Sequence, residues 1–385
     1  MTSCLFDTEL IAATFLSDGR PDSHGPPAAG SGHIRSTSPP HFAWCHAGVM
    51  NAVGAVRTTG IYCRDDCPAR PLPANTARFP FAAAAEAAGF RACHRCRPYR
   101  RDLTVADGMP ELVCRGVRLI AGGALDDATE GSLADRLGVS PRHLRRVFLQ
   151  YAGVTADQLA RSRRAHFARR LLDDTDLRVA DIAFAAGFGS VRQLNRVLAE
   201  VFRATPGELR ARRRVADRLR ADGGLAVRLA HDGTLDFADA LRHLSARATP
   251  AVEAVDGGTY RRTILVDGDP GMIEISRRSA TKLLLVAHLP RLDGLIHHVG
   301  RVRRIFALDE PGAPYGAWDP FEARVHDVVR SGVPDAAAAR AVMGDLARRF
   351  GTPVPGLGPA GLSRTFPQPG AALLRSLSVL DLADV

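Results

Sequence analysis

The sequence predicts a multidomain α+β protein, and three observations support this fold class. The chain has 385 residues, more than the roughly 250 to 300 at which a single hydrophobic core stops growing. Four cysteines in a C-x3-C and a C-x2-C pair mark a small unit, and they are Cys63, Cys67, Cys93 and Cys96. Farther along, apolar residues at helical spacing over 108–214 give way near residue 225 to strands mixed with helices.

The chain divides into a tail and four segments. Residues 1–36 are rich in Gly, Pro, Ser and His, and we expect a disordered tail because this composition buries too little apolar surface to fold. The segments are a small cysteine-bearing α+β domain over 37–102, an all-α segment over 108–214, an antiparallel-sheet α+β domain over 219–311 and a partial helical domain over 312–385.

The cysteine segment shows one clear helix, in FAAAAEAAGF, which ends at Gly89 between two cysteine-bearing turns. So small a unit needs a metal to fold. Four thiolates at this spacing form a tetrahedral Zn²⁺ site, so we expect a small zinc-bound α+β domain. Cys4, Cys45 and Cys114 lie outside the cluster and are expected to be ordinary thiols.

The all-α segment contains two similar halves, SLADRLGVSPRHLRRVF and RVADIAFAAGFGSVRQLNRVL. Each half has a helix with alanine at its centre, a turn containing glycine, and a second helix. This is the plan of the helix-turn-helix motif, so the segment is predicted to be an all-α double helix-turn-helix.

The third segment alternates strand and helix patterns. We expect an antiparallel sheet with helices on one face, with strands in LAVRLAH, TYRRTILV, GMIEIS and KLLLVAHL and helices in DFADALRHLSARA and LDGLIHHVGRVRRIF. In the last segment, a helix starts with Asp319 as the N-cap and Pro320 at its first position. A second helix in PDAAAARAVMGDLARRF and one short final helix complete a segment with little material for a core of its own.

The charge favours a polyanionic partner. The net charge is +10, and Lys282 is the only lysine, so the basicity comes almost entirely from arginine. The guanidinium fork suits phosphates and guanine edges, so a nucleic acid is favoured over a small neutral substrate. Arg-biased codon usage would raise the arginine content equally well without any function.

The sequence also predicts the compartment. No run of 18 apolar residues occurs, and no basic stretch precedes the short apolar segment at the N-terminus, so we expect a cytoplasmic protein that does not enter a membrane. In a reducing compartment, clustered cysteines are metal ligands more often than disulfides.

On spacing alone, a Cys4 zinc site is most often structural. The alternative is that the metal keeps one thiolate deprotonated and that this thiolate attacks an alkyl group. The surrounding sequence favours the alternative, because AVRTTGIYCRDDCPARPLPANTARF followed by AAEAAGFRACHRCRP resembles the zinc domain of the bacterial Ada family, whose members repair methylphosphotriesters in DNA.

This resemblance implies that Cys63 accepts a methyl group from a methylated backbone phosphate, while Cys63, Cys67, Cys93 and Cys96 bind the zinc. The thioether is not regenerated, so each molecule reacts once. Four thiolates on Zn²⁺ carry about −2 and the methylated site about −1, and we expect the smaller repulsion to strengthen binding to the DNA backbone.

The chain departs from the Ada family at several positions. The stretch over 44–54 is shortened, and Asp65 and Asp66 replace a Pro-Ser pair, so we expect two carboxylates to repel the phosphate and slow the transfer. The Cys93-His94-Arg95 sequence is similar to the acceptor motif of alkylguanine methyltransferases, but Ala92 replaces its proline and Cys96 follows at zinc spacing. We therefore reject a second methyl-acceptor domain.

The two half-repeats resemble the AraC-type double helix-turn-helix, which places one recognition helix of each half in successive major grooves. The resemblance implies base-reading roles for the polar residues of the second helices, with Ser140 and Ser190 holding phosphates. These polar residues are Arg142, His143, Arg145 and Arg146 in the first half and Arg192, Gln193, Asn195 and Arg196 in the second. The alternative is that these side chains form solvated helix faces.

The C-terminal third resembles 3-methyladenine glycosylases of the AlkA type, in YRRTILVDGDPGMIEIS, VRRIFALD, GAWDPFEARVHDVVR and RFGTPVPGLGPAGLSRTFPQP. The resemblance covers their N-terminal domain and the start of their helical domain, and we expect a truncated glycosylase. No helix-hairpin-helix with its catalytic aspartate is found, and no hairpin precedes Asp381 or Asp384, so base release is not expected. Two interpretations of this segment are left: it is a basic, non-catalytic surface that binds DNA or a partner, or it is the remnant of a broken gene.

The sequence thus predicts a zinc-dependent, single-turnover transfer of methyl from DNA methylphosphotriester to a protein cysteine. Sequence-specific DNA binding and transcriptional activation of alkylation repair would accompany it, with RNA polymerase as a further partner. The first alternative is a transcription regulator with purely structural zinc, and the second is a working 3-methyladenine glycosylase.

Overall fold

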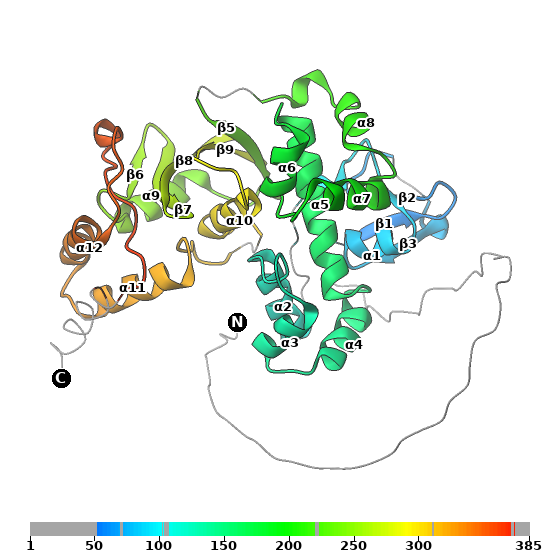
Figure 1. Ribbon diagram of the computed structural model, residues 1–385, viewed down its shortest axis with the longest axis horizontal. Coiled ribbons are helices and arrows are strands. Elements are labelled where there is room, and N and C mark those ends of the chain that lie inside the picture. Colours follow the sequence, from blue (N-terminus) through cyan, green and yellow to red (C-terminus); the bar gives the residue numbers. More distant parts are fainter. Residues whose placement is uncertain are drawn as a thin grey trace, which may run out of the picture. The chain divides into compact units, whose positions relative to one another are not determined.

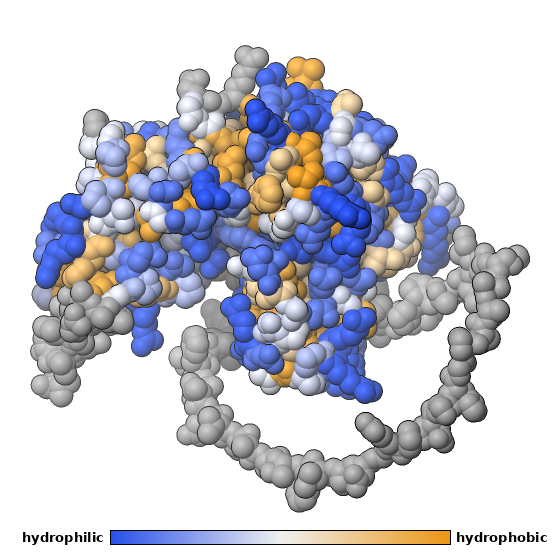
Figure 2. Space-filling view, viewed as in Figure 1, coloured by the Kyte–Doolittle hydropathy of each residue, from blue (hydrophilic) through white to orange (hydrophobic). Residues whose placement is uncertain are grey.

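The computed structural model describes residues 52–69, 72–101, 103, 108–219, 223–309, 312–370 and 373. The predicted tail, most of the shortened stretch before Cys63, and the final helix with Asp381 and Asp384 lie outside these residues. Within them the fold is mixed α+β, as predicted, and contains two separate sheets (Figure 1). Figure 2 shows mainly hydrophilic side chains on the visible face, with hydrophobic ones in small separate groups.

The cysteine domain is a four-stranded sheet with one helix. Its strands β1 (Val53–Val56), β2 (Ile61–Cys63), β3 (Thr76–Phe79) and β4 (Arg91–Ala92) have the order β3-β1-β2-β4. Strands β2 and β4 run parallel, whereas the other pairs are antiparallel. Short 3-10 helices, η1 (Pro73–Asn75) and η2 (Pro98–Arg100), precede β3 and follow the last cysteine.

The helix predicted between the cysteine turns is α1 (Ala82–Ala87). Gly89 follows it with a φ of +90°, a left-handed conformation that glycine adopts without steric cost. Its N–H donates to the carbonyl of Glu86, and the N–H of Phe90 donates to that of Ala85. Gly89 therefore ends the helix as expected, because these bonds satisfy its last carbonyl groups.

The all-α segment contains both predicted helix-turn-helix units. In each, a serine N-cap starts the second helix: the side chains of Ser140 and Ser190 accept hydrogen bonds from the N–H groups of His143 and Gln193. The helices are α2 (Glu111–Ala121), α3 (Glu130–Leu137), α4 (Pro141–Tyr151), α5 (Ala156–Asp174), α6 (Val179–Ala185), α7 (Val191–Phe202) and α8 (Pro206–Ala211), followed by η3 (Val215–Asp217).

Helix α5 is the central element of this arrangement (Figure 1). It contacts α1 and η2 of the cysteine domain, α2, α6, α7 and α8 of the helix-turn-helix segment, and the first strand of the second sheet. Side chains all around it are buried, including charged ones. A helix that is rich in Arg and Asp yet buried on every side must have its charges paired.

The second sheet has five antiparallel strands in the order β5-β9-β8-β7-β6. Alternate residues of β8 and β9 are buried and share one core with the apolar side chains of helices α9 (Phe237–Arg247) and α10 (Leu295–Ile305). The strands are β5 (Leu225–Ala230), β6 (Glu253–Asp256), β7 (Thr259–Val266), β8 (Asp269–Ser279) and β9 (Lys282–His288). Four of them were expected, whereas β6 was not.

The last segment packs against this sheet. Asp319 caps α11 (Pro320–Ser331), as predicted, because its side chain accepts from the N–H of Glu322. The guanidinium of the buried Arg262 in β7 donates to both oxygens of Glu322, at 3.1 and 2.7 Å. Val252 joins a core cluster with residues of α11 and of α12 (Ala336–Phe350); η4 (Gly358–Ala360) follows. The described part of this segment therefore folds together with the sheet.

Candidate metal centre and nucleic-acid interface

The cysteine cluster forms where two parallel strands end. Tyr62 in β2 pairs with Ala92 in β4, and the N–H of Cys93 donates to the carbonyl of Tyr62 at 3.0 Å. Each strand runs directly into a cysteine, so Cys63 and Cys93 lie side by side. A tight turn that starts at Arg64 brings back Cys67, and one that starts at Cys93 brings back Cys96.

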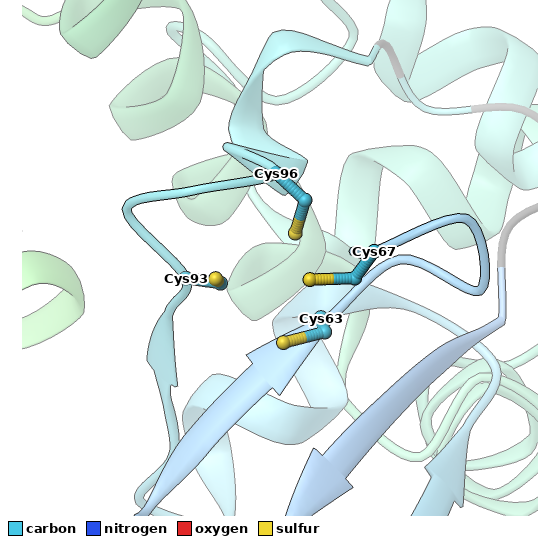
Figure 3. A group of neighbouring side chains, drawn as sticks. All are labelled: Cys63, Cys67, Cys93 and Cys96. Carbon is cyan, nitrogen blue, oxygen red and sulfur yellow. The ribbon is translucent and has the colours of Figure 1, made fainter. Parts of the chain in front are cut away.

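The geometry fits a tetrahedral zinc ion. The four sulfur atoms lie within 4.8 Å of one another, and Figure 3 shows them turned toward a common centre. Zinc–sulfur bonds of about 2.3 Å in a tetrahedron place the sulfurs about 3.8 Å apart. All four cysteines are buried, with 4 to 8% of their surface exposed. The donor set, four soft thiolates, is the one that structural zinc sites use.

Four thiols this close influence one another's protonation. Hydrogen bonding to Cys96, together with burial, raises the pKa of Cys63. The hydrogen bond from Cys63 in turn lowers the pKa of Cys96 to about 5. A divalent cation bound by all four sulfurs displaces the remaining protons, because thiolates are the ligands.

The loop between Cys63 and Cys67 contains two carboxylates that are paired with arginines. Asp65 accepts two hydrogen bonds from Arg78, at 2.5 and 3.0 Å. Asp66 lies 3.1 Å from Arg64 and 3.3 Å from Arg101. The sequence identified both aspartates but not their partners.

A second set of contacts links the metal domain to α5. The carboxylate of Glu86 in α1 lies 2.6 Å from the imidazole of His166, and it accepts from the hydroxyls of Ser162 at 2.6 Å and Tyr62 at 2.5 Å. Burial opposes ionisation, but His166 and these hydrogen bonds lower the pKa of Glu86 below its ordinary value. Tyr62 directly precedes Cys63, so these hydrogen bonds attach the strand that ends in the metal site to α1 and α5.

The residues after Cys96 form a third set of contacts. Tyr99 donates to Asp173 at 3.0 Å, and Arg100 lies 3.2 Å from Asp173 and 3.0 Å from Asp174. Arg228 of β5 reaches the same oxygen of Asp174 at 2.7 Å. Sequence reasoning missed this network, because these residues look like solvated charges when read along the chain.

The predicted DNA-reading side chains lie on the two second helices, α4 and α7. Each helix turns its apolar side inward, with Leu144 buried in α4 and Leu194 in α7. His143 and Gln193 are half-buried, and Gln193 accepts from the N–H of Gly189. The exposed members are Arg142, Arg145, Arg146, Ser190, Arg192, Asn195 and Arg196.

Three family models match the chain in succession. The metal-binding domain of Ada matches residues 50–99, a helix-turn-helix domain matches 133–212, and the AlkA N-terminal domain matches 226–312. The chain therefore carries these three domains, and the cysteine cluster is a zinc-binding site of the Ada type. Together they define a multidomain zinc- and DNA-binding protein.

The curated relatives are named for two functions, transcriptional activation and DNA repair. The chain is 39% identical over 267 residues to the probable bifunctional transcriptional activator/DNA repair enzyme AlkA of Mycobacterium tuberculosis, covering 67% of this chain and 52% of the relative. It is 31% identical to the bifunctional transcriptional activator/DNA repair enzyme AdaA of Bacillus subtilis, over 35% of this chain and 63% of that protein. The Ada enzyme of Escherichia coli is 36% identical, over 31% of this chain and 33% of its own length.

The chain thus spans about half the length of the first of these relatives. No helix among the described residues is long and apolar enough to cross a membrane.

Proposed function

We propose that this protein removes methyl groups from methylphosphotriesters in DNA by transferring them to Cys63. The main support is the buried group of four cysteines within residues that match the metal-binding domain of Ada. Zinc, when bound, keeps the thiolates deprotonated at neutral pH. We assign Cys63, Cys67, Cys93 and Cys96 as its ligands.

The transfer is a displacement at carbon. The Cys63 sulfur attacks the methyl carbon, a sulfur–carbon bond forms, and the bond between that carbon and the phosphate oxygen breaks. The electron pair leaves with the oxygen, so the neutral triester becomes an anionic diester and the thiolate becomes a neutral thioether. No proton is needed, and Cys63 is consumed.

The choice of Cys63 rests on its place in the Ada motif. Exposure does not single out one sulfur, because Cys63 is 4% and Cys96 8% exposed. The substrate must therefore approach an almost closed cluster. Arg57, Arg91 and Arg95 lie close to the cysteines in sequence and are candidates for holding the backbone phosphates.

The experiment is a peptide map after reaction with duplex DNA containing one methylphosphotriester. Trypsin cleaves after arginine and separates the cysteines into the peptides 58–64, 65–78, 92–95 and 96–100. The proposal predicts one added methyl group on peptide 58–64 only. No added methyl on any of the four would favour the alternative, a regulator whose zinc is purely structural.

We further propose that α4 and α7 enter successive major grooves and that the protein activates transcription of alkylation-repair genes, with RNA polymerase as a partner. The match to a helix-turn-helix domain and the exposed arginines support this. A reporter behind a candidate promoter should respond to a methylating agent only when Cys63 is present.

The AlkA-like part receives no catalytic role in this proposal. Its buried carboxylates among the described residues, Glu253 and Glu322, are both paired with Arg262. Release of free methylated base from alkylated DNA would instead establish a glycosylase.

A further inference from the structure

Arg97 and Arg100 pair with Asp173 of α5, and the other arginines around the cysteine cluster fall into two groups. Arg64, Arg78 and Arg101 are paired with the carboxylates of the Cys63–Cys67 loop. The structure gives Arg57, Arg91 and Arg95 no such carboxylate partner among its described residues. Near the proposed acceptor, part of the positive charge is therefore compensated by Asp65 and Asp66.

These pairs are open to solvent. The side chains of Arg78 and Asp65 are 58% and 56% exposed, and those of Arg101 and Asp66 are 41% and 54% exposed. Exposed ion pairs contribute little to stability, so the two carboxylates are not needed to hold the fold. Their effect is on the charge that an approaching DNA backbone meets.

The two forms of the DNA backbone differ in that charge. An intact phosphodiester is an anion, whereas a methylphosphotriester is neutral. An arginine paired with a carboxylate attracts an anion less, and the carboxylate itself repels it. Both effects weaken binding of an intact phosphodiester at the acceptor more than binding of the neutral triester, whereas the neighbouring phosphodiesters are the same in both. Since phosphate contacts dominate DNA affinity, this difference discriminates between damaged and undamaged sites.

We propose that Asp65 and Asp66 are specificity-determining residues, which lower the affinity of the acceptor site for undamaged DNA by pairing with Arg78, Arg64 and Arg101. The inference rests on the proposed function of Cys63. It also revises the expectation that the aspartates merely slow the transfer: the repulsion is directed at the anionic diester, which is the competitor rather than the substrate.

The test uses the zinc-loaded, full-length protein and the variants Asp65→Asn, Asp66→Asn and the double variant. Asp345→Asn is the matched control, because Asp345 pairs with Arg348 at 2.8 Å and the two side chains are 62% and 57% exposed. This control matches Asp65→Asn, because it changes the net charge equally and frees an arginine of α12 that is about as exposed as Arg78. Zinc content and melting temperature verify that every variant is folded.

Two quantities are measured for each protein. The first is the dissociation constant for an undamaged duplex over a series of salt concentrations. The second is the inhibition of methyl transfer by that duplex, normalised to the rate without competitor. We expect the double variant to bind undamaged DNA roughly 5- to 20-fold more tightly at low salt. The slope of the logarithm of the binding constant against the logarithm of the salt concentration should steepen by about one for each arginine that gains a phosphate contact. Inhibition should strengthen in parallel.

For the Asp345→Asn control, the dissociation constant for the undamaged duplex should stay within about twofold of that of the unmodified protein. Equal tightening in Asp345→Asn would overturn the proposal, because net charge alone would then explain the effect. Weaker DNA binding by the aspartate variants would overturn it as well, since the carboxylates would then be orienting the arginines toward phosphate. If no protein takes up methyl, the proposed function fails, while the undamaged-duplex affinities still decide what Asp65 and Asp66 do.

Discussion

Arg100, four residues after Cys96, lies 3.0 Å from Asp174 at the end of α5. Asp174 is 2% exposed in its side chain and also binds Arg228 of the second sheet, so one carboxylate joins three parts of the chain. Burial raises the pKa of Asp174 despite both guanidinium groups. For Arg100, burial alone would lower the pKa, but Asp174 and Asp173 raise it. Burial therefore determines the direction of the pKa shift for Asp174, whereas the two carboxylates determine it for Arg100.

We expect Arg100→Met to destabilise the protein by about 1.5–3 kcal/mol, because Asp173 and Asp174 each lose a charged hydrogen-bond donor, while Arg228 still pairs with Asp174. Arg242→Met is the control: Arg242 is 69% exposed in its pair with Asp239, and exposed pairs of this kind contribute about 0–1 kcal/mol. Thermal and urea unfolding provide the measurement. Similar losses for both variants would show that the network around Asp174 adds nothing beyond surface charge.

The contact between Glu86 and His166 predicts a pH dependence. The pKa of Glu86 is lowered from 4.5 in the folded protein, so its ionised form stabilises the fold. This contribution is present above about pH 4.5 and is lost as the pH falls through the lowered pKa. Glu86→Gln should cost about 1–3 kcal/mol near neutral pH, and the difference from the unmodified protein should shrink toward pH 3. A difference independent of pH would mean that the charge on Glu86 is not responsible.

Removal of zinc should unfold the metal domain selectively. With a chelator, amide hydrogen exchange is expected to accelerate most over residues 53–100, because the four cysteines form a separate cluster that the metal holds together. Residues 225–288 of the second sheet should keep their protection, since their buried side chains belong to a core cluster that is separate from the cysteines. Equal loss of protection in both regions would indicate that the metal supports the entire fold.

Two cysteine variants separate the acceptor from its supporting ligands. Cys63→Ser should abolish methyl uptake, whereas Cys93→Ser should lose zinc and unfold the metal domain. Zinc content, circular dichroism and the tryptic map measure these effects. Methyl found on another cysteine of Cys63→Ser would make the assignment of the acceptor wrong.

The second helix-turn-helix offers a test of base reading. Arg192→Ala and Arg196→Ala should each cost about 1–3 kcal/mol of specific DNA affinity if these exposed side chains contact guanine. Glu200→Ala, on the same helix, is the control because a carboxylate adds no attraction to DNA. A uniform loss on all sequences would instead place the arginines on phosphates.

Much of the local structure could be predicted because local chemistry determines it. Gly89 ends its helix, Ser140 and Ser190 cap theirs, and Asp319 begins α11, all through bonds within a few residues. The cysteine cluster was predictable for a similar reason, because the spacing within each pair fixes its turn.

The remaining features depend on contacts between distant residues. Strand β6 is only four residues long and begins and ends with an acidic residue, so it lacks a strand pattern. The Arg and Asp residues of α5 suggest a solvated helix, yet their partners lie far away in sequence, as with Tyr99 and Asp173. Only the folded arrangement shows that these charges are internal.

The central position of α5 limits how this chain can be dissected or recombined. A fragment that ended after Arg101 would expose Tyr62, Glu86 and Tyr99, which are covered in the whole protein by a helix that begins 55 residues later. Exchange of the metal domain between related proteins during evolution would have to preserve both the partner of Glu86 and the acidic pair at the end of α5. We therefore expect a substitution at a contact with α5 in one of the three domains to be accompanied by compensating substitutions in α5 or in the other domains.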